Sequence, residues 1–451
     1  PKGTAVRRGM LTFDGVPTIP DRIVRRTRQY LESRYARFAD WDSRGRSMLI
    51  RTRFANTVQL HQVKAPMGTR TQLTFFAEPV ARADYLPQSV DNSVLLMMDQ
   101  GGAENFQLFR LDLLEGKTTA LTHPESRVTH YRFARQGALA YNSNARNGRD
   151  FDIYLAQPGE EGTAERVHEG QGLWIPLDFS PDQKQLLLLQ YISINESRLH
   201  LLDLQTKQRV PIPATEETPS SQPAAAPTRV AYREARFAAD GKSIYFTSDR
   251  DKEFVQLYHY DLARKRLTPL STDLAWNVEK IEVSPNRQWV ALTVNEEGYS
   301  RLYLMSTRGK RMKRVPLPDG LVREMRWSSR SELGFTLEQP TAPPDVFSYD
   351  PRRRKLVQWT RSEVGGLNTD FLIKPQLVHY PTFDSVEDKS RQIPAFYFRP
   401  PGKGPHPVVV IIHGGPEAQY RPYFSSTIQY LVMEMGVAVL CPNVRGSDGY
   451  G

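Results

Sequence analysis

The chain has 451 residues, of which 39% are hydrophobic, 10% aromatic and 24% charged, and its formal net charge is +10. This composition is ordinary for a globular protein, and the length allows two or three domains around a sizeable core. No apolar run approaches the roughly 18–20 residues that a membrane-spanning helix needs. We therefore expect no membrane span.

The chain contains a single cysteine, Cys441, which excludes an internal disulfide. It ends the apolar stretch 437–441, so we expect an inert packing residue at a strand end. The chain begins at Pro1 with neither Met nor a signal-like stretch. If a leader was removed, the protein is periplasmic or secreted, and otherwise it is cytoplasmic. The sequence leaves the localisation open.

The N-terminal segment, residues 1–35, contains the basic stretch PDRIVRRTRQYLESR at 20–34. Its spacing predicts a short helix with Ile23, Tyr30 and Leu31 on one side. A basic helix of this kind could lie on a membrane surface. Packing across a domain boundary is the interpretation that we favour.

A short alternating segment then recurs seven times. The copies begin at residues 58, 106, 151, 197, 255, 300 and 344, at intervals of 48, 45, 46, 58, 45 and 44 residues. Each copy is preceded by a turn and a second strand-like segment, most clearly at 179–189, 237–248 and 283–293. Strand, turn and strand at this period predict the blades of a β-propeller.

Seven such blades would occupy residues 36–360 as a closed, all-β ring without exposed sheet edges. The one long interval contains PATEETPSSQPAAAPTR at 213–229. Its Pro, Ser and Ala content predicts a flexible loop between the fourth and fifth blades. Glu216 and Glu217 in this loop are expected to be solvated rather than to anchor a substrate.

The positive charge is concentrated in two runs, RGKRMKR at 308–314 and PRRRK at 351–355. Both fall between strand-like segments, without a nucleic-acid-binding motif or a pattern of stacking aromatic residues. We expect solvated turns, and no nucleic-acid partner.

After residue 360 the period changes, and residues 361–451 are predicted to begin an α/β domain. The expected elements are paired strands at 377–385 and 393–400, a strand at 407–412, a helix at 425–435 and a strand at 437–442. The last three form a βαβ crossover. The β-branched run 408–412 is typical of a strand buried on both faces of a parallel sheet. Four strands and one helix cannot cover both faces, so we expect this strand to be partly exposed.

The motif His413-Gly414-Gly415-Pro416 follows that strand, at the edge where open α/β sheets carry their sites. Two consecutive glycines let the backbone approach a ligand closely and direct N–H groups toward it. At this position they predict a loop that donates to an oxyanion and stabilises charge developing on a carbonyl oxygen.

Taken together, these features resemble the prolyl oligopeptidase family of serine peptidases. The resemblance rests on the propeller repeats followed by PVVVIIHGGP at 407–416 and NVRGSDGYG at 443–451, and the HGGP form is most similar to the acylaminoacyl-peptidase branch. It implies an α/β-hydrolase domain capped by the propeller, and cleavage of short peptides by a Ser-Asp-His triad. It also implies that the N–H of Gly415 donates to the oxyanion, while His413 and Gly414 shape the loop.

The sequence departs from relatives of this family in two ways. Prolyl oligopeptidases proper carry Tyr at the position of His413, so strict cleavage after proline is not expected. Dipeptidyl-peptidase relatives hold the substrate amine with a pair of glutamates on a propeller helix. The glutamate pairs at 160–161, 216–217 and 296–297 lie in loop-like contexts, and none is given that role.

No catalytic triad is expected within this chain. A nucleophile elbow would have the pattern G-x-S-x-G, and the three G-x-S starts at Gly45, Gly241 and Gly298 lack the second glycine and fall inside blades. The triad order in this fold is Ser, Asp, His, so all three are expected beyond Gly451. Roughly 100–200 further residues would complete a domain of usual size.

The leading hypothesis is a serine peptidase of oligopeptidase, acylaminoacyl- or dipeptidyl-peptidase type. It would act on short peptides through an acyl-enzyme, with the propeller limiting access. Two alternatives stay open: a propeller that binds a peptide or protein without turnover, and an esterase on the same scaffold. No cofactor or metal is expected, because no His, Cys or carboxylate cluster has ligand spacing. The oligomeric state is open.

Overall fold

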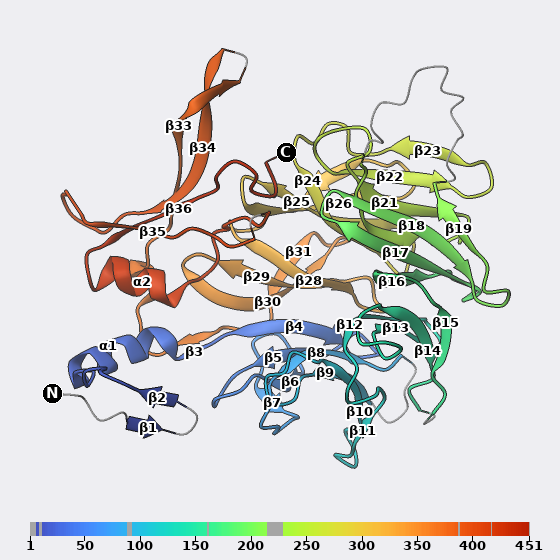
Figure 1. Cartoon of the computed structure of the whole chain (residues 1–451), viewed down its shortest axis with the longest axis horizontal. Helices are drawn as coiled ribbons and strands as arrows, with labels where there is room; N and C mark the ends of the chain where they lie inside the picture. Colours follow the sequence, from blue (N-terminus) through green and yellow to red (C-terminus); the bar gives the residue numbers. More distant parts are fainter. Residues whose placement is uncertain are drawn as a thin grey trace.

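The computed structural model describes residues 6–8, 11–87, 93–159, 162–213, 229–386, 388–415 and 417–450 (Figure 1). Seven four-stranded antiparallel sheets follow one another along the chain. Figure 1 shows them succeeding one another from blue to orange as propeller-like blades, so the predicted propeller is confirmed. The glutamate pairs at 160–161 and 216–217, and most of the predicted loop at 213–229, lie outside the described residues.

The four strands of each blade pair in chain order, so the first strand lies at one edge of its sheet. The recurring segment of the sequence is always the third strand. The first four blades consist of β4 Ala36–Trp41, β5 Met48–Thr52, β6 Gln59–Val63 and β7 Arg70–Gln72; β8 Val80–Tyr85, β9 Val94–Met98, β10 Gln107–Leu111 and β11 Thr118–Ala120; β12 Val128–Phe133, β13 Leu139–Ser143, β14 Asp152–Ala156 and β15 Glu165–His168; β16 Leu173–Phe179, β17 Gln185–Ser193, β18 Glu196–Asp203 and β19 Arg209–Ile212. The last three consist of β20 Tyr232–Phe237, β21 Ser243–Ser248, β22 Gln256–Asp261 and β23 Arg266–Pro269; β24 Asn277–Val283, β25 Trp289–Glu296, β26 Tyr299–Ser306 and β27 Met312–Arg314; β28 Leu321–Trp327, β29 Leu333–Gln339, β30 Ala342–Asp350 and β31 Lys355–Gln358.

An aspartate at the end of the third strand forms the next turn in four blades. Oδ1 of Asp203 accepts hydrogen bonds from the backbone N–H groups of Gln205 at 3.0 Å and Thr206 at 2.8 Å. The same arrangement recurs at Asp112, Asp261 and Asp350. Because a short carboxylate can satisfy the donors of the turn that follows it, this aspartate sets the hairpin into the fourth strand.

The ring closes between the first and the last blade. The backbone N–H of Phe38 in β4 donates to Oγ1 of Thr336 in β29 at 2.8 Å. Trp41 and Trp359 meet edge to face with ring centroids 5.4 Å apart. Outside the blades, β3 (Ser33–Arg34) pairs antiparallel with β32 (Glu363–Val364). The two ends of the propeller are therefore joined by side-chain packing and a short strand pair.

The N-terminal segment forms β1 (Val6–Arg8), β2 (Leu11–Phe13) and α1 (Asp21–Leu31). Of the three side chains expected on one packed side of the helix, only Tyr30 is buried, while Ile23 and Leu31 are exposed. Tyr30 packs edge to face on Tyr430 of α2 (Ser426–Met433). The packed side of α1 is thus narrow, because Tyr30 is the buried side chain that packs on α2, while Arg26 only approaches Glu434 at 3.9 Å.

The C-terminal segment forms a second kind of sheet, with strand order β33–β34–β36–β35. Its elements are η1 Thr369–Phe371, β33 Gln376–Val386, β34 Lys389–Phe398, β35 Val408–Val410 and β36 Ala438–Pro442. Strands β35 and β36 are parallel and are connected through α2, as the predicted crossover requires. Val408 to Val410 are exposed on an edge strand, as expected for a sheet without cover. In Figure 1 the β33–β34 hairpin projects away from the blades.

The described residues contain two α-helices, so they show this crossover and not a complete α/β-hydrolase domain. The division into segments 1–35, 36–360 and 361–451 stays a prediction. Strand β4 begins at Ala36 and β31 ends at Gln358, close to the predicted limits of the propeller.

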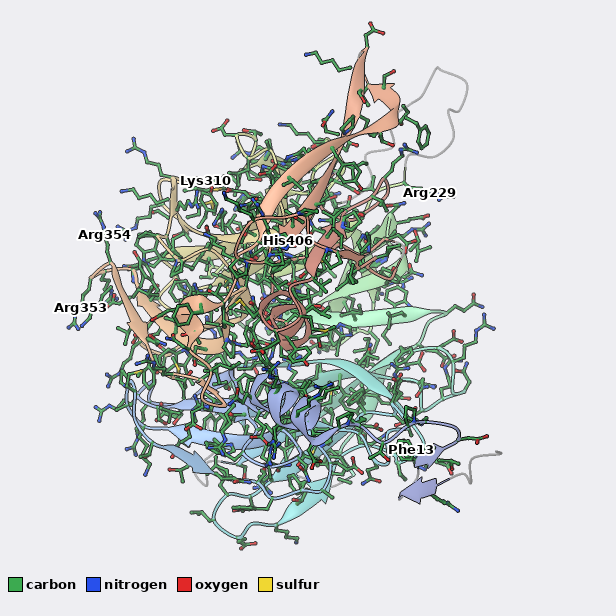
Figure 2. The ribbon with its side chains drawn as sticks, turned by 90° about the vertical axis from the view of Figure 1, so that its left-hand side faces the viewer. Phe13, Arg229, Lys310, Arg353, Arg354 and His406 are labelled. Atoms are coloured by element: carbon green, nitrogen blue, oxygen red, sulfur yellow. The ribbon has the colours of Figure 1, made fainter. Side chains whose placement is uncertain are left out.

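The two basic runs are largely exposed and lie partly in turns, as expected, although Met312–Arg314 form β27 and Lys355 begins β31. Lys310, Arg353 and Arg354 lie at the edge of the molecule in Figure 2. Neither α1 nor α2, the helices of the described part of the chain, is long and apolar enough to span a membrane.

Candidate active site and central cavity

The loop with the HGGP motif connects β35 to α2 through residues 411–425. The side chain of Ser425 accepts a hydrogen bond from Ile428 N–H and caps the helix. Gly436, with a φ of +64°, ends the turn after α2 and lets the chain enter β36. The parallel pairing of β35 with β36 brings the residues after both strands to the same edge of the sheet.

Within the motif, Gly415 is the residue for which the backbone requires glycine. Its φ is +141°, and a Cβ there would lie 2.5 Å from the backbone N of Ala418 and 2.7 Å from that of Glu417. A Cβ on Gly414 would meet nothing within 4 Å. The residue predicted to donate to an oxyanion is therefore also the one that tolerates no side chain. Pro416 lies outside the described residues.

His413 forms a hydrogen bond that the sequence did not predict. Its Nε2 lies 2.8 Å from Oγ of Ser447, and its Nδ1 lies 3.0 Å from the carbonyl oxygen of Gly414. Ser447 is buried and lies in a turn after β36, not on a strand-to-helix elbow. The pair therefore has the atoms of a Ser-His dyad but joins two loops, and it orients the imidazole of His413.

The second motif of the sequence, at 443–450, supports the first. The side chain of Asn443 accepts from Tyr420 N–H at 2.7 Å and donates to the Tyr420 carbonyl at 3.1 Å. Its amide nitrogen also lies 3.2 Å from the hydroxyl of Tyr450. The backbone N–H of Asp448 donates to the carbonyl of Glu417. The two motifs that carry the resemblance thus form one hydrogen-bonded unit.

Arg421 attaches this unit to the sixth blade. Its guanidinium donates to Oε1 of Glu279 at 2.7 Å, to the carbonyl of Gly298 at 2.8 Å and to Oγ of Ser300 at 3.1 Å. Because one guanidinium donates to three partners at once, its position is restricted to a single geometry. The loop of His413 to Gly415 is therefore fixed relative to the blade that faces it.

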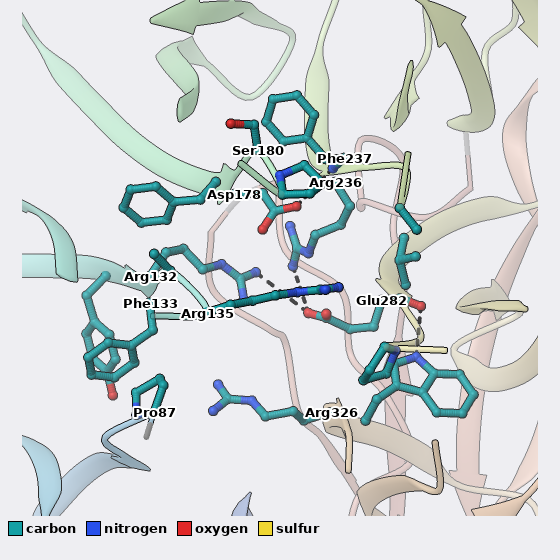
Figure 3. A pocket seen from close by; sticks show the side chains of 18 of the residues that line it. Pro87, Arg132, Phe133, Arg135, Asp178, Ser180, Arg236, Phe237, Glu282 and Arg326 are labelled. Atoms are coloured by element: carbon teal, nitrogen blue, oxygen red, sulfur yellow. Dashed lines mark hydrogen bonds and ion pairs between the residues drawn. The ribbon is translucent and has the colours of Figure 1, made fainter. Parts of the chain in front are cut away.

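Two cavities occupy the centre of the propeller. The wide chamber has a volume of about 900 Å³ and extends to Arg421 of the C-terminal segment. The narrow chamber has a volume of about 370 Å³ and is shown in Figure 3. Six residues line both chambers and are called the junction here: Arg82, Tyr131, Arg132, Arg236, Glu282 and Arg326.

The chambers are lined by a charged residue at the same place in every blade. The penultimate residue of each first strand is charged: Asp40, Asp84, Arg132, Asp178, Arg236, Glu282 and Arg326. All seven line one or both chambers. They are called the charged ring here. Their intervals of 44, 48, 46, 58, 46 and 44 residues follow the blade repeat, and this periodic signal was missed in the sequence.

Carboxylates at the ring are shared between cations. Figure 3 shows Glu282 between Arg236, at 2.8 Å, and Arg132, at 3.6 Å. Asp84 is likewise shared by Arg82 and Arg326. Beside the ring, Glu234 is shared by Arg236 and Lys280, and Glu324 by Arg37 and Arg51. Because a buried charge is costly unless it is paired, such sharing leaves cations that are only partly compensated.

The environment separates the pKa values of the ring carboxylates. Burial raises the pKa of Asp40 to about 6, although Arg326 opposes the shift. Burial also opposes ionisation of Asp84 and Glu282, but neighbouring arginines outweigh it and lower the pKa of each to about 2. Burial lowers the pKa of Arg132 to about 10, and the positive charge of Arg236 adds to the effect. The charged ring therefore combines residues that stay charged with residues whose pKa is shifted toward the neutral form.

The other residues singled out in the sequence have structural surroundings. Cys441 is buried in β36, and burial raises the pKa of its thiol to about 12, as expected of a packing residue. Glu296 binds Arg301 at 3.2 Å, and Glu297 lies 3.5 Å from Nε2 of His379. In the described part of the chain, no group of three or more His, Cys, Asp or Glu residues is placed to hold a metal ion.

Comparisons with known proteins find related peptidases. No family model matches the chain. A protein of Emericella nidulans named "Probable dipeptidyl-peptidase 5" is 25% identical over 233 residues, which cover 48% of this chain and 31% of that protein. Prolyl oligopeptidase A of Galerina marginata is 27% identical over 177 residues, covering 37% of this chain and 23% of that protein. The matched region spans less than a third of the length of these curated relatives.

Solved structures of similar proteins show the same fold over most of the chain. A prolyl endopeptidase superposes with a TM-score of 0.75 at 14% identity, covering 95% of this chain and 64% of the other. A puromycin-hydrolysing peptidase of Mycobacterium tuberculosis gives 0.75 at 16% identity, covering 94% and 68%. A puromycin hydrolase gives 0.76 at 15% identity, also covering 94% and 68%. The relatives of this chain are thus members of the prolyl oligopeptidase family of serine peptidases, and the resemblance predicted from its motifs is confirmed.

Proposed function

We propose that this chain provides the propeller and the oxyanion-binding loop of a serine peptidase that hydrolyses short peptides. The observation that carries the proposal is Gly415, whose φ and crowded surroundings allow no side chain. It lies after a β-strand of a crossover, in a loop fixed to the propeller by Arg421. A loop of this kind, held in place before the reaction, is suited to stabilise a developing oxyanion.

The mechanism that we propose is acyl transfer. A serine activated by histidine and aspartate would attack the scissile carbonyl, and the N–H of Gly415 would be one of two donors to the oxyanion. His413, held by Ser447, would shape the donor loop and would not act as the general base. The sequence has no G-x-S-x-G elbow, so we place the triad beyond Gly451, on the remainder of an α/β-hydrolase domain.

The exposed edge of the C-terminal sheet supports this placement. Val408 and Val410 are each 52% exposed, and Ile412 is 73% exposed. A β-branched strand of this composition is normally covered on both faces. We propose that further strands and helices of the same domain cover it. That the peptidase is of the acylaminoacyl type, as the HGGP motif indicates, is part of this proposal.

A second function is favoured by one observation. The described residues line both chambers and supply all seven charges of the ring, whereas the sequence contains no nucleophile elbow. A propeller that binds peptides without turnover would need nothing else. An esterase on the same scaffold would use the same oxyanion loop, and hydrolysis of matched ester and amide substrates would distinguish it from a peptidase.

The test is a Gly415→Ala substitution in the full-length protein. We expect kcat to fall about 10²-fold or more, as for a lost oxyanion donor, while labelling by a serine-directed phosphonate persists. Gly309→Ala is the matched control, because Gly309 lies in an exposed turn and a Cβ there meets nothing within 4 Å. Unchanged kcat in the Gly415 variant would refute the oxyanion assignment. Peptide binding without hydrolysis or labelling in the unmodified protein would favour the binding function.

A further inference from the structure

The junction between the two chambers has an excess of positive charge. Of the six residues that line both chambers, four are arginines and one is a glutamate. Asp84 lines the wide chamber alone, and Asp40 and Asp178 line the narrow chamber alone. The compensating carboxylates thus lie to either side, and the passage itself is lined mainly by guanidinium groups.

Arg132 is the junction arginine with the fewest partners. Among the described residues, its one ion pair joins Nη2 to Oε1 of Glu282 at 3.6 Å, a distance too long for a good hydrogen bond. The same oxygen is already held by Arg236 at 2.8 Å. Arg326, by contrast, contacts both Asp40 and Asp84. Since a guanidinium carries five N–H donors, Arg132 keeps donors for a further acceptor.

Two further carboxylates, Glu234 and Asp178, act electrostatically on Arg132. Glu234 is already paired with Arg236 and Lys280, and Asp178 accepts a hydrogen bond from the N–H of Phe237. Arg82 is bound to Asp84 at 3.2 Å, and its guanidinium lies 3.8 Å from the centre of the Tyr131 ring. The side chain of His130 is open to the wide chamber, where desolvation by the walls and the adjacent cations Arg82 and Lys280 lower its pKa to about 4. An anion that entered the junction would meet Arg132 among cations whose own partners are already in place.

The wide chamber connects this position to the proposed active-site loop. Its lining includes both Arg132 and Arg421, and Arg421 follows that loop by six residues. Apolar and aromatic side chains, including Ile175, Leu189 and Tyr232, also line it. A chamber of about 900 Å³ with such walls can hold several residues of a peptide.

We propose that Arg132 is the main donor of a carboxylate-binding site at the junction, which takes a carboxylate of a peptide lying in the wide chamber. The guanidinium would bind the carboxylate through its remaining N–H donors, in the bidentate manner that arginine favours. The ligand class is therefore short peptides with a free C-terminus or an acidic side chain at the end remote from the active-site loop. That the molecule bearing this carboxylate is a peptide rests on the proposed function.

The experiment is a titration of the full-length protein with three peptides of five small apolar residues. One has a free C-terminal carboxylate, one is the C-terminal amide, and one is an amide whose last residue is Glu. Binding is measured by calorimetry, and mass spectrometry of the peptides after titration confirms that they are intact. Succinate is titrated separately as a carboxylate without a peptide.

We expect the free acid to bind about 10- to 100-fold more tightly than the plain amide, as for a charge-assisted hydrogen bond. Recovery of that affinity by the Glu peptide would assign the site to any terminal carboxylate, and absence of recovery would assign it to the C-terminus. In Arg132→Met the advantage of the acid over the amide should disappear. Arg353→Met, which removes the same charge from an exposed turn, should retain it.

Equal binding of acid and amide would overturn the carboxylate site and leave the peptide-binding function standing. Binding of neither peptide would count against both. Arg132-dependent binding of succinate without peptide binding would overturn the peptide as carrier. The thermal melting temperature of Arg132→Met controls for folding, and the conservative Arg132→Lys variant should retain part of the advantage, because it keeps the charge but loses the fork.

Discussion

Nε2 of His413 lies 2.8 Å from Oγ of Ser447, across two loops that are 34 residues apart in the sequence. The contact exists because β35 and β36 run parallel, so that the residues following each strand meet at one edge. A His-Ser pair invites interpretation as a catalytic dyad. The burial of Ser447 and its place in a turn favour a structural tie between the two motifs.

We therefore predict that Ser447→Ala keeps the reactivity of the catalytic serine. Phosphonate labelling of the full-length protein should be retained, and kcat should fall by no more than about tenfold. The free energy of unfolding should fall by about 1–3 kcal/mol, because a partly buried imidazole nitrogen loses its partner. Complete loss of labelling in a variant that remains folded would instead identify Ser447 as the nucleophile.

The sequence predicted the blades because their determinants are local. Alternation of apolar residues recurs within each repeat. In four blades an aspartate at the end of the third strand, such as Asp203, binds the turn that follows it within a few residues. The charged ring is equally periodic, but its meaning depends on closure of the ring, which brings together residues as distant as Asp40 and Arg326. The sequence therefore contains the spacing of these charged residues but does not show that they converge when the ring closes.

The candidate site was predicted in part for the same reason. The glycine-rich loop was recognisable from its motif, and the structure shows why Gly415 must be glycine. The partner of His413 was not predictable, because it depends on the pairing of two strands. Ile23, Tyr30 and Leu31 were predicted on one side of the N-terminal helix, and of these only Tyr30 is buried, since helical spacing defines a face but not the width of the surface it meets.

Arg326 should be one of the most sensitive positions for stability. It lies between Asp40, at 3.2 Å, and Asp84, so Arg326→Met would leave two buried carboxylates without a shared partner. We expect a loss of about 3–5 kcal/mol in the free energy of unfolding, measured by denaturant titration. Addition of Asp40→Asn should recover part of the loss, because it removes one of the two charges. Arg353→Met should have no measurable effect, since that side chain is 82% exposed.

Acid stability should depend on two histidines at the third and fourth blades. His168 and His200 lie against Trp174, with ring centroids at 4.3 and 5.2 Å. Burial lowers the pKa of each to about 4, from an ordinary value of 6.5. The unfolded chain therefore takes up these protons first, so that stability is complete above pH 6.5 and falls as the pH is lowered toward 4.

The corresponding measurement is urea unfolding between pH 7 and pH 4.5. Each histidine should contribute a loss of about 1–2 kcal/mol over this range, after allowance for its partial exposure. Replacement of both by Phe, which keeps a ring against Trp174, should flatten the dependence. His379, which is exposed beside Glu297, is the control position for substitution by Phe. An unchanged slope in the double variant would show that other groups cause the acid loss.

The contact between the two helices should determine how firmly the N-terminal segment is held. The hydroxyl of Tyr30 donates to Oε1 of Glu434 at 3.0 Å, and its ring packs on Tyr430. Tyr30→Phe should cost about 1 kcal/mol and Tyr30→Ala about 3 kcal/mol or more, because the second variant also removes the buried ring. The other contacts of α1 are polar and lie near the surface: Arg53 donates to the carbonyl of Leu31 at 2.9 Å, and Arg26 lies 3.9 Å from Glu434. In these variants, hydrogen exchange should therefore rise in α1 and not in the blades. An equal rise in α1 and across the propeller would show that the N-terminal segment unfolds as one cooperative unit with the propeller.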